Sequence, residues 1–138
     1  MFLVTAMGYL LDADVCIAYL RGTNRMLKAG FAARSFHEIY LSPFVKADLY
    51  NAACTSVGGA QNSLKVEEFV AAFTVLPFDN AAACKQAEIQ AALTKLNLTL
   101  RERDIQLAAI AMVRECSLVT QRVTDFSRIG GLDVESWG

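Results

Sequence analysis

Short apolar runs alternate with longer amphipathic segments along most of this chain. The runs have the length of buried strands, and the segments repeat apolar positions at helical spacing. The pattern predicts strands at residues 8–13, 38–41, 74–76, 117–120 and 132–135. It predicts helices at residues 15–21, 24–34, 42–56, 62–72, 80–96 and 102–114. Because strands alternate with helices, we expect a three-layer α/β/α domain with a four- or five-stranded, mainly parallel sheet.

Polar residues at the starts of several helices support these boundaries. Ser42 and Pro43 combine a capping hydroxyl with a proline in the first turn. Asp14 is expected to cap the helix over residues 15–21, and Asp79 or Asn80 the helix that ends near residue 96.

Composition limits the chain to ordinary globular classes. Its 138 residues fit one domain, residues 1–138, and 54% of them are apolar, which excludes disorder. The formal net charge is -1, from 13 basic and 14 acidic residues, so the total charge does not indicate nucleic-acid binding. Such binding would need a local basic patch instead.

The N-terminus and the cysteines indicate a reducing compartment. Residues 1–11 are apolar but carry no Lys or Arg, which makes a poor signal peptide, and they are too few to span a membrane. The cysteines form no Cys-x-x-Cys pair and are expected to be buried, reduced thiols: Cys16, Cys54, Cys84 and Cys116. We therefore expect a cytoplasmic protein with no membrane contact.

Four aspartates carry the strongest chemical signal: Asp12, Asp48, Asp104 and Asp125. Each lies beside an apolar segment that should be core. Acids distributed this way can converge at one edge of a parallel sheet, where open α/β folds place their sites. Clustered ionised carboxylates repel one another unless they bind a cation. The pattern therefore favours a hard divalent metal and chemistry on phosphate esters.

Each acid also has a purely structural interpretation. Asp104 suits the positive end of a helix dipole, although Ala108 and Ala111 on the same helical face would let that helix approach the sheet closely. Asp48 can be a solvated surface acid, and Asp125 can cap a turn at residues 126–129. The signal therefore lies in the set of four.

Arginines stand next to these acids in the sequence. Arg101 and Arg103 precede Asp104, and Arg122 precedes Asp125. They either belong to a solvated face paired with nearby glutamates or bind phosphates beside a metal, and we take Arg103 and Arg122 as candidate substrate-binding residues. No P-loop, Gly-x-Gly-x-x-Gly or His-Glu-x-x-His motif occurs, so nucleotide-dependent and zinc-protease chemistry have no support.

The order and spacing of several stretches resemble PIN-domain proteins, and most closely VapC-type toxins of bacterial toxin–antitoxin pairs. The resemblance covers nearly the whole chain. It is carried by residues 9–17, 41–52, 76–79, 103–109 and 118–120, and by the C-terminal stretch from Asp125 to Trp137.

The resemblance implies a Mg²⁺- or Mn²⁺-dependent endoribonuclease. Its acidic quartet would be Asp12, Asp48, Asp104 and Asp125, all of them metal ligands, with Thr120 as the supporting hydroxyl. The chain departs from the family at Asp48, where glutamate is usual, at Gln121, where asparagine is usual, and at Asp14, where a small polar residue is usual.

The resemblance also implies partners. These are an RNA substrate, a cognate antitoxin protein and a second copy of the chain in a homodimer. Helices 24–34 and 42–56 are rich in apolar residues and could form a groove for an antitoxin helix. The alternative function is a PIN-like module that binds nucleic acid or protein without cleavage because its metal site is weakened.

Overall fold

The centre of the fold is the short strand β1 (Gly8–Leu11). The computed structural model of the protein describes residues 8–138. Within them the sheet has five strands in the order β3-β2-β1-β4-β5, and every neighbouring pair is parallel. The other strands are β2 (Ile39–Leu41), β3 (Thr74–Val75), β4 (Cys116–Val119) and β5 (Val134–Glu135). The prediction of four or five mainly parallel strands is confirmed.

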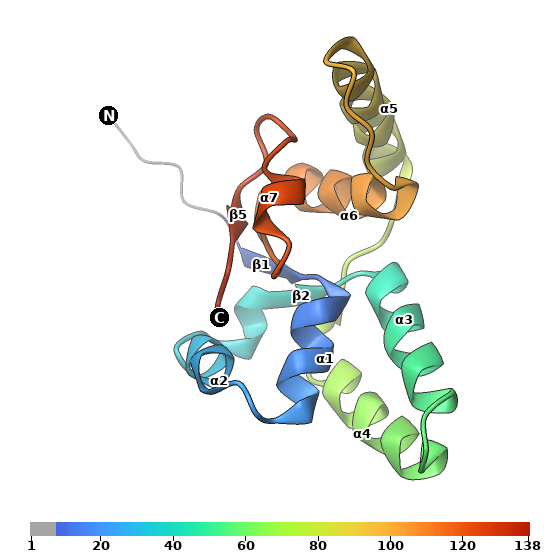
Figure 1. The fold of residues 1–138 in the computed structure, drawn as a ribbon, viewed down its shortest axis with the longest axis vertical. Helices are drawn as coiled ribbons and strands as arrows, with labels where there is room; N and C mark the ends of the chain where they lie inside the picture. Colours follow the sequence, from blue (N-terminus) through green and yellow to red (C-terminus); the bar gives the residue numbers. More distant parts are fainter. Residues whose placement is uncertain (1–7) are drawn as a thin grey trace.

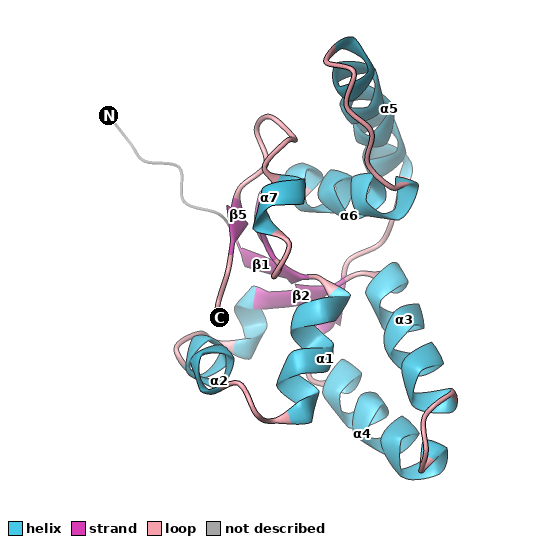
Figure 2. Cartoon of the chain, viewed as in Figure 1, coloured by secondary structure: helices cyan, strands magenta, loops and turns pink. Residues whose placement is uncertain are grey.

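Helices cover both faces of this sheet, as Figure 1 and Figure 2 show. One layer holds four of them: α1 (Ala13–Arg21), α2 (Arg25–Ala32), α3 (Pro43–Cys54) and α4 (Gly59–Ala71). The opposite layer holds α5 (Asn80–Lys95), α6 (Glu102–Val113) and the single turn α7 (Val123–Phe126). A 3-10 turn, η1 (Phe36–Glu38), leads into β2. The three-layer prediction is therefore confirmed.

The register of the two central strands, β1 and β4, determines which residues lie together at the carboxyl edge of the sheet. Leu10 lies opposite Leu118 and Leu11 opposite Val119, and all four side chains are fully buried. Both strands consequently end at the same level. The residues that follow them, Asp12 and Thr120, therefore emerge side by side at the carboxyl edge of the sheet.

Helix caps match the sequence prediction at α3 and α5 and differ at α1. The Ser42 hydroxyl accepts a hydrogen bond from the Val45 N–H, and Asp79 caps α5 through Ala82. Asp14 does not cap α1; the cap is Asp12, whose extended backbone follows β1 directly. Asp14 lies in the first turn instead, where its carboxylate is favoured by the helix dipole.

Helix α6 packs between α5 and β4, as its nearly all-apolar sequence predicted. Ala108 and Ala111 are both fully buried. Their small side chains bring the helix axis close to the sheet, so that Asp104 in its first turn reaches the strand ends.

The cysteine prediction is half right. Cys16 and Cys116 are buried, and burial raises the pKa of the Cys116 thiol to about 11. Cys54 and Cys84 are exposed, because they lie on outward faces of α3 and α5. All four are free thiols.

Among residues 8–138, no helix is both long and apolar enough to cross a bilayer. The sequence prediction about the extreme N-terminus falls partly on residues 1–7, which lie outside the described part of the chain. The assignment of residues 1–138 to one domain stays a prediction.

Candidate active site

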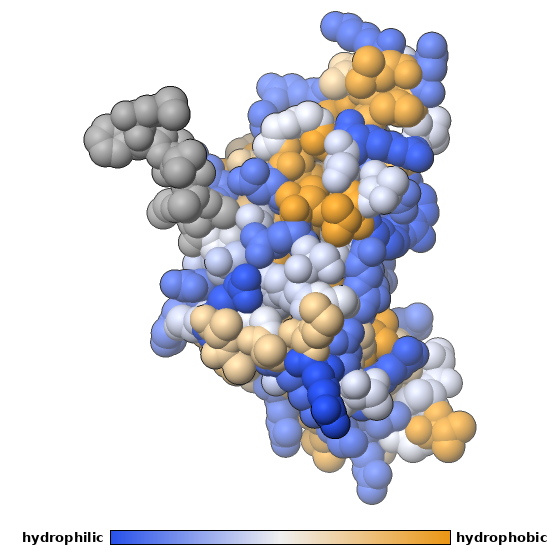
Figure 3. Space-filling view, turned by 60° about the vertical axis from the view of Figure 1, so that its left-hand side comes forward, coloured by the Kyte–Doolittle hydropathy of each residue, from blue (hydrophilic) through white to orange (hydrophobic). Residues whose placement is uncertain are grey.

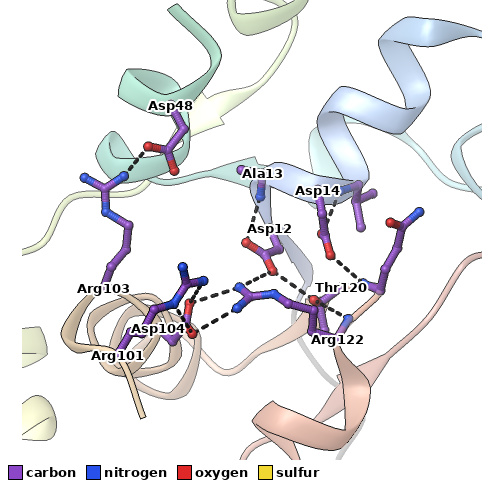
Figure 4. Close-up of polar contacts among 11 residues, drawn as sticks. Asp12, Ala13, Asp14, Asp48, Arg101, Arg103, Asp104, Thr120 and Arg122 are labelled. Atoms are coloured by element: carbon purple, nitrogen blue, oxygen red, sulfur yellow. Dashed lines mark hydrogen bonds and ion pairs between the residues drawn. The ribbon is translucent and has the colours of Figure 1, made fainter. Parts of the chain in front are cut away.

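A polar pocket of about 340 Å³ lies at the carboxyl edge of the sheet, between the two helical layers. Acids from three elements line it, together with three arginines, and Figure 4 shows how these side chains point toward one another. They are Asp12, Asp14, Asp48, Asp104, Arg101, Arg103 and Arg122. Three of the four predicted acids and both predicted substrate-binding arginines therefore share one pocket.

Asp12 is held rigidly at the floor of this pocket. Its N–H continues the ladder of β1 by donating to the Val119 carbonyl at 2.9 Å. One carboxylate oxygen, Oδ1, accepts from the Ala13 N–H at 2.8 Å, and the other, Oδ2, accepts from the buried Thr120 hydroxyl at 2.8 Å. Thr120 thus fixes the orientation of the Asp12 carboxylate, while its part in the function stays a prediction.

Asp104 and Arg122 form the central ion pair of the pocket. The two terminal nitrogens of Arg122 donate to the two oxygens of Asp104 at 2.9 and 3.0 Å, a bidentate geometry. The same Nη2 also donates to Asp12 Oδ2 at 2.9 Å. One guanidinium therefore joins the acid at the end of β1 to the acid in the first turn of α6.

These contacts shift the pKa values of both partners. Burial acts to raise the pKa of Asp104, but hydrogen bonds and positive charge from Arg122, and then from Arg101, outweigh it and hold that pKa below its usual value. Hydrogen bonds to Asp104 foremost raise the pKa of Arg122, against the opposing effect of burial. Both groups are therefore charged near neutral pH.

Asp48 lies on the α3 side of the pocket and is only partly buried. Its carboxylate pairs with Arg103 of α6, on the other side of the pocket (Figure 4). The Arg103 guanidinium also lies 5.7 Å from the centre of the Phe44 ring. The pairing turns the Asp48 carboxylate toward Arg103, so this acid faces the same pocket without joining Asp12 and Asp104.

Asp125 is placed apart from the other three acids. It lies inside α7, and it is not among the residues that line the pocket. The turn at residues 126–129 forms, with the Ile129 N–H donating to the Phe126 carbonyl at 3.0 Å, but within residues 8–138 the Asp125 carboxylate accepts no hydrogen bond from it and therefore does not cap it. Across residues 8–138, no group of three acidic, histidine or cysteine side chains is close enough to hold a metal ion in this conformation.

Asp14 is a pocket residue that the sequence reasoning treated mainly as a helix cap. Its Oδ2 accepts from the Gln121 N–H at 3.1 Å and its Oδ1 from the Val15 N–H at 2.7 Å. Burial raises the pKa of Asp14, and the charge of Asp12 adds to that rise. The Asp12-Ala13-Asp14 spacing could have indicated that Asp14 lies in the pocket, because it places both acids at the end of the same strand.

The comparison with known families gives this site its context. The PIN domain family model matches residues 9–132. Ribonuclease VapC1 of Rickettsia felis is 32% identical over 132 residues, which cover 93% of this chain and 95% of the relative. The chain therefore belongs to the PIN-domain family and, within it, to the VapC-type proteins.

Other relatives agree with this placement. The tRNA(fMet)-specific endonuclease VapC of Shigella flexneri is 27% identical, over 94% of this chain and 97% of the relative. The crystal structure of DNA-bound VapBC from Salmonella typhimurium has a TM-score of 0.88 at 25% identity, with coverage of 96% and 99%. VapBC2 of Rickettsia felis, bound to a promoter DNA fragment, shares the fold with a TM-score of 0.87 at 22% identity and coverage of 96% and 100%.

Proposed function

We propose that this protein is a divalent-metal-dependent endoribonuclease that acts as the toxin of a toxin–antitoxin pair. One observation carries the proposal. A single guanidinium nitrogen, Nη2 of Arg122, lies 2.9 Å from an oxygen of Asp12 and 2.9 Å from an oxygen of Asp104. The two carboxylates thus converge on one position for a cation. RNA as the substrate is supported by the ribonuclease names of the relatives.

The donor set suits a hard divalent ion, Mg²⁺ or Mn²⁺, because it consists of carboxylate oxygens. We assign Asp12 and Asp104 as direct ligands, and Asp48 as a ligand that acts once it separates from Arg103. Asp125 keeps the ligand role that the family resemblance implies. When bound, the ion would supply Lewis acidity and a water molecule activated for attack on phosphorus.

The protein's own side chains orient this chemistry and bind the RNA backbone. The Thr120 hydroxyl keeps Asp12 in place, so the carboxylate does not need to reorganise. Arg101 and Arg103 are largely exposed at the mouth of the pocket, where they suit phosphate oxygens. A cytoplasmic location is consistent with an RNA substrate and with free thiols at all four cysteines.

Removing either central acid tests the proposal. Asp12→Asn and Asp104→Asn should each lower the rate of single-stranded RNA cleavage in Mn²⁺ by about two orders of magnitude or more, because a neutral amide is a poor ligand for a hard cation. Cleavage is followed on labelled RNA by gel electrophoresis, and EDTA should abolish it in the wild-type protein.

The matched control is Glu102→Gln, which removes one charge from the same turn of α6 outside the pocket. This variant should cleave at the wild-type rate. Full activity of either asparagine variant, or wild-type activity in excess EDTA, would contradict the proposal.

We further propose that a protein antitoxin binds the groove formed by α1, α3 and α4. This groove, of about 330 Å³, is lined by apolar side chains that include Leu20, Leu49 and Val66. Ile17 lines both the groove and the acidic pocket, so the two are adjacent. A segment lying in the groove would end beside the acids. A solved relative from Mycobacterium tuberculosis is described as a member of the VapBC family of toxin-antitoxin systems, which supports a protein antitoxin as the partner.

Growth measurements in bacteria test the antitoxin. Expression of the chain alone should arrest growth, and the product of the neighbouring open reading frame should relieve the arrest. Ala52→Glu places a charge in the groove and should keep the toxicity but lose the relief. Ala71→Glu, an exposed site of α4 outside the groove, should still be relieved. A harmless protein, or normal relief of Ala52→Glu, would count against the antitoxin site.

One observation favours the alternative of a binding module without cleavage. Arg122 bridges Asp12 and Asp104, and Arg103 pairs with Asp48, so each of these three acids already has an arginine partner. A module of this kind would bind RNA but neither bind Mn²⁺ nor cleave. Titration with Mn²⁺ followed by incubation with RNA separates the two functions.

A further inference from the structure

Arg122 places a positive charge at the point where the acidic carboxylates converge. Its guanidinium donates three hydrogen bonds of 2.9 to 3.0 Å, two to Asp104 and one to Asp12. It thereby touches both acids that we assign as direct metal ligands. A guanidinium and a divalent ion cannot lie between the same two carboxylates at once.

The arginine is held in this position by more than the two acids. Its backbone N–H donates to the Thr120 hydroxyl at 3.0 Å, and that hydroxyl in turn donates to Asp12. Its guanidinium carbon lies 5.1 Å from the centre of the fully buried Phe126 ring. Contacts of its backbone and of its side chain therefore both hold Arg122 in the pocket.

Arg101 shows what a peripheral arginine looks like at the same carboxylate. Its contacts with Asp104 are longer, at 3.3 and 3.5 Å, and its side chain is 73% exposed against 30% for Arg122. It also makes no contact with Asp12 in the described structure. The pocket thus contains one arginine that bridges the acids and one that approaches them from solvent.

We propose that Arg122 is an internal counterion that competes with the divalent metal for Asp12 and Asp104. The inference rests on the proposed metal-dependent function. Asp12 and Asp104 share the positive charge of Arg122 while it bridges them, and the pocket binds metal between these acids only when the guanidinium turns out of the bridge. Metal affinity of the free protein is accordingly lowered by the free energy of breaking the Arg122 contacts.

Displacement of Arg122 by the metal would also give this arginine a role in RNA binding. Once displaced, its charged group would be free to bind an RNA phosphate together with the exposed Arg101 and Arg103. Metal binding therefore exposes a phosphate-binding cation, and by thermodynamic reciprocity an RNA phosphate that captures Arg122 favours metal binding. Metal and RNA should each raise the affinity of the protein for the other.

Calorimetric titration with Mn²⁺ of wild-type protein, Arg122→Gln and Arg101→Gln tests the competition. Arg122→Gln should bind Mn²⁺ at least about tenfold more tightly than wild type, since the metal no longer has to displace charge-assisted hydrogen bonds. Arg101→Gln removes one charge together with longer, solvent-exposed contacts to the same carboxylate, and its effect should be about threefold or less. Arg122→Lys keeps the charge without the fork and should fall between wild type and Arg122→Gln.

A second measurement follows the arginine itself, with Mg²⁺ as a diamagnetic probe. The Nε–H resonance that disappears in Arg122→Gln should shift on titration of the wild-type protein with Mg²⁺. The resonance of Arg34, which is enclosed by Tyr9 and Trp137, should stay in place and serves as the internal reference. Circular dichroism of each variant in EDTA checks that the fold is retained.

The outcomes separate the competition from the proposed function. Tighter binding by Arg122→Gln together with a shifted Arg122 resonance supports the competition. Equal Mn²⁺ affinity of wild type, Arg122→Gln and Arg101→Gln, with an unmoved Arg122 resonance, overturns it and leaves the metal-dependent function standing. An absence of Mn²⁺ binding in all variants overturns both.

Discussion

At the scale of single residues, Asp48 differs from the other pocket acids in its exposure to solvent. Its side chain is 36% exposed, whereas those of Asp12 and Asp104 are 8% and 7% exposed. Its partner Arg103 is also about half exposed, and such ion pairs are screened by water and weak. Asp48 can therefore leave Arg103 and bind a hydrated metal ion at little cost in free energy.

Lengthening this side chain tests whether Asp48 contributes to the metal site. Asp48→Glu extends the carboxylate by one methylene toward the pocket, so Mn²⁺ binding should tighten and RNA cleavage should be at least as fast as in wild type. Calorimetric titration and the cleavage assay measure both. Asp133→Glu, at an exposed site away from the pocket, controls for the added methylene. Weaker metal binding with slower cleavage would show that the backbone is already adjusted to aspartate.

The residues of the site divide into those that the sequence predicts and those that depend on tertiary contacts. Asp12 and Thr120 directly follow apolar strands, so their shared position at the sheet edge is predictable from the strand pattern. The pairing of Arg122 with Asp104 is not, because an arginine beside an acid in sequence is equally consistent with phosphate binding. Only the packing of α6 beside β4 selects the counterion position.

At the scale of elements, the start of α3 determines where Asp48 projects. Ser42 is fully buried, and its hydroxyl satisfies the Val45 N–H at 3.1 Å, while Pro43 occupies the first turn. This cap fixes the point at which the chain leaves β2 and enters the helix. The orientation of Asp48 on α3 therefore depends on a residue that does not itself line the pocket.

Removing this cap should destabilise the protein measurably. Ser42→Ala leaves a buried N–H without its acceptor and should lower the free energy of unfolding by about 1 kcal/mol or more. Urea denaturation followed by circular dichroism gives the value. Thr94→Ala is the control, because the exposed Thr94 hydroxyl only bonds back to its own helix and its loss should change stability by less than about 0.5 kcal/mol. Equal stability of Ser42→Ala and wild type would show that α3 begins correctly without the cap.

The elements themselves were largely predictable, and the exceptions have local causes. The long helices and the apolar strands carry clear periodicity. The turn α7 is missed because Val123–Phe126 is too short to show a helical period. The α1 cap is misassigned by two residues because Asp12 and Asp14 are both good caps, and only the end of β1 at Leu11 decides between them.

At the scale of the whole molecule, the site exists because the sheet order brings distant segments to one edge. β1 and β4 are neighbours in the centre, which joins Asp12 to Thr120. Helices α3 and α6 lie in opposite layers, and they bring Asp48 and Asp104 to that edge from either side (Figure 1). The parallel topology therefore explains why acids spread over most of the chain meet in one pocket.

A second surface is relevant to assembly. An apolar hollow of about 190 Å³ between α5 and α6 is lined by residues such as Leu93, Leu96 and Met112. In Figure 3, apolar side chains gather in the upper half of one face of the molecule. Large apolar patches commonly mark protein contacts. The homodimer that the family resemblance implies stays a prediction, and apolar surface is available for it.

The account depends most on one claim, that Asp12 and Asp104 hold a divalent ion in the place now bridged by Arg122. Anomalous diffraction from crystals grown in Mn²⁺ measures this directly. We expect a manganese peak within coordinating distance of both carboxylates, with the Arg122 guanidinium turned out of the bridge. A structure at saturating Mn²⁺ that shows no peak between these acids, with Arg122 still bound to both, would contradict the account.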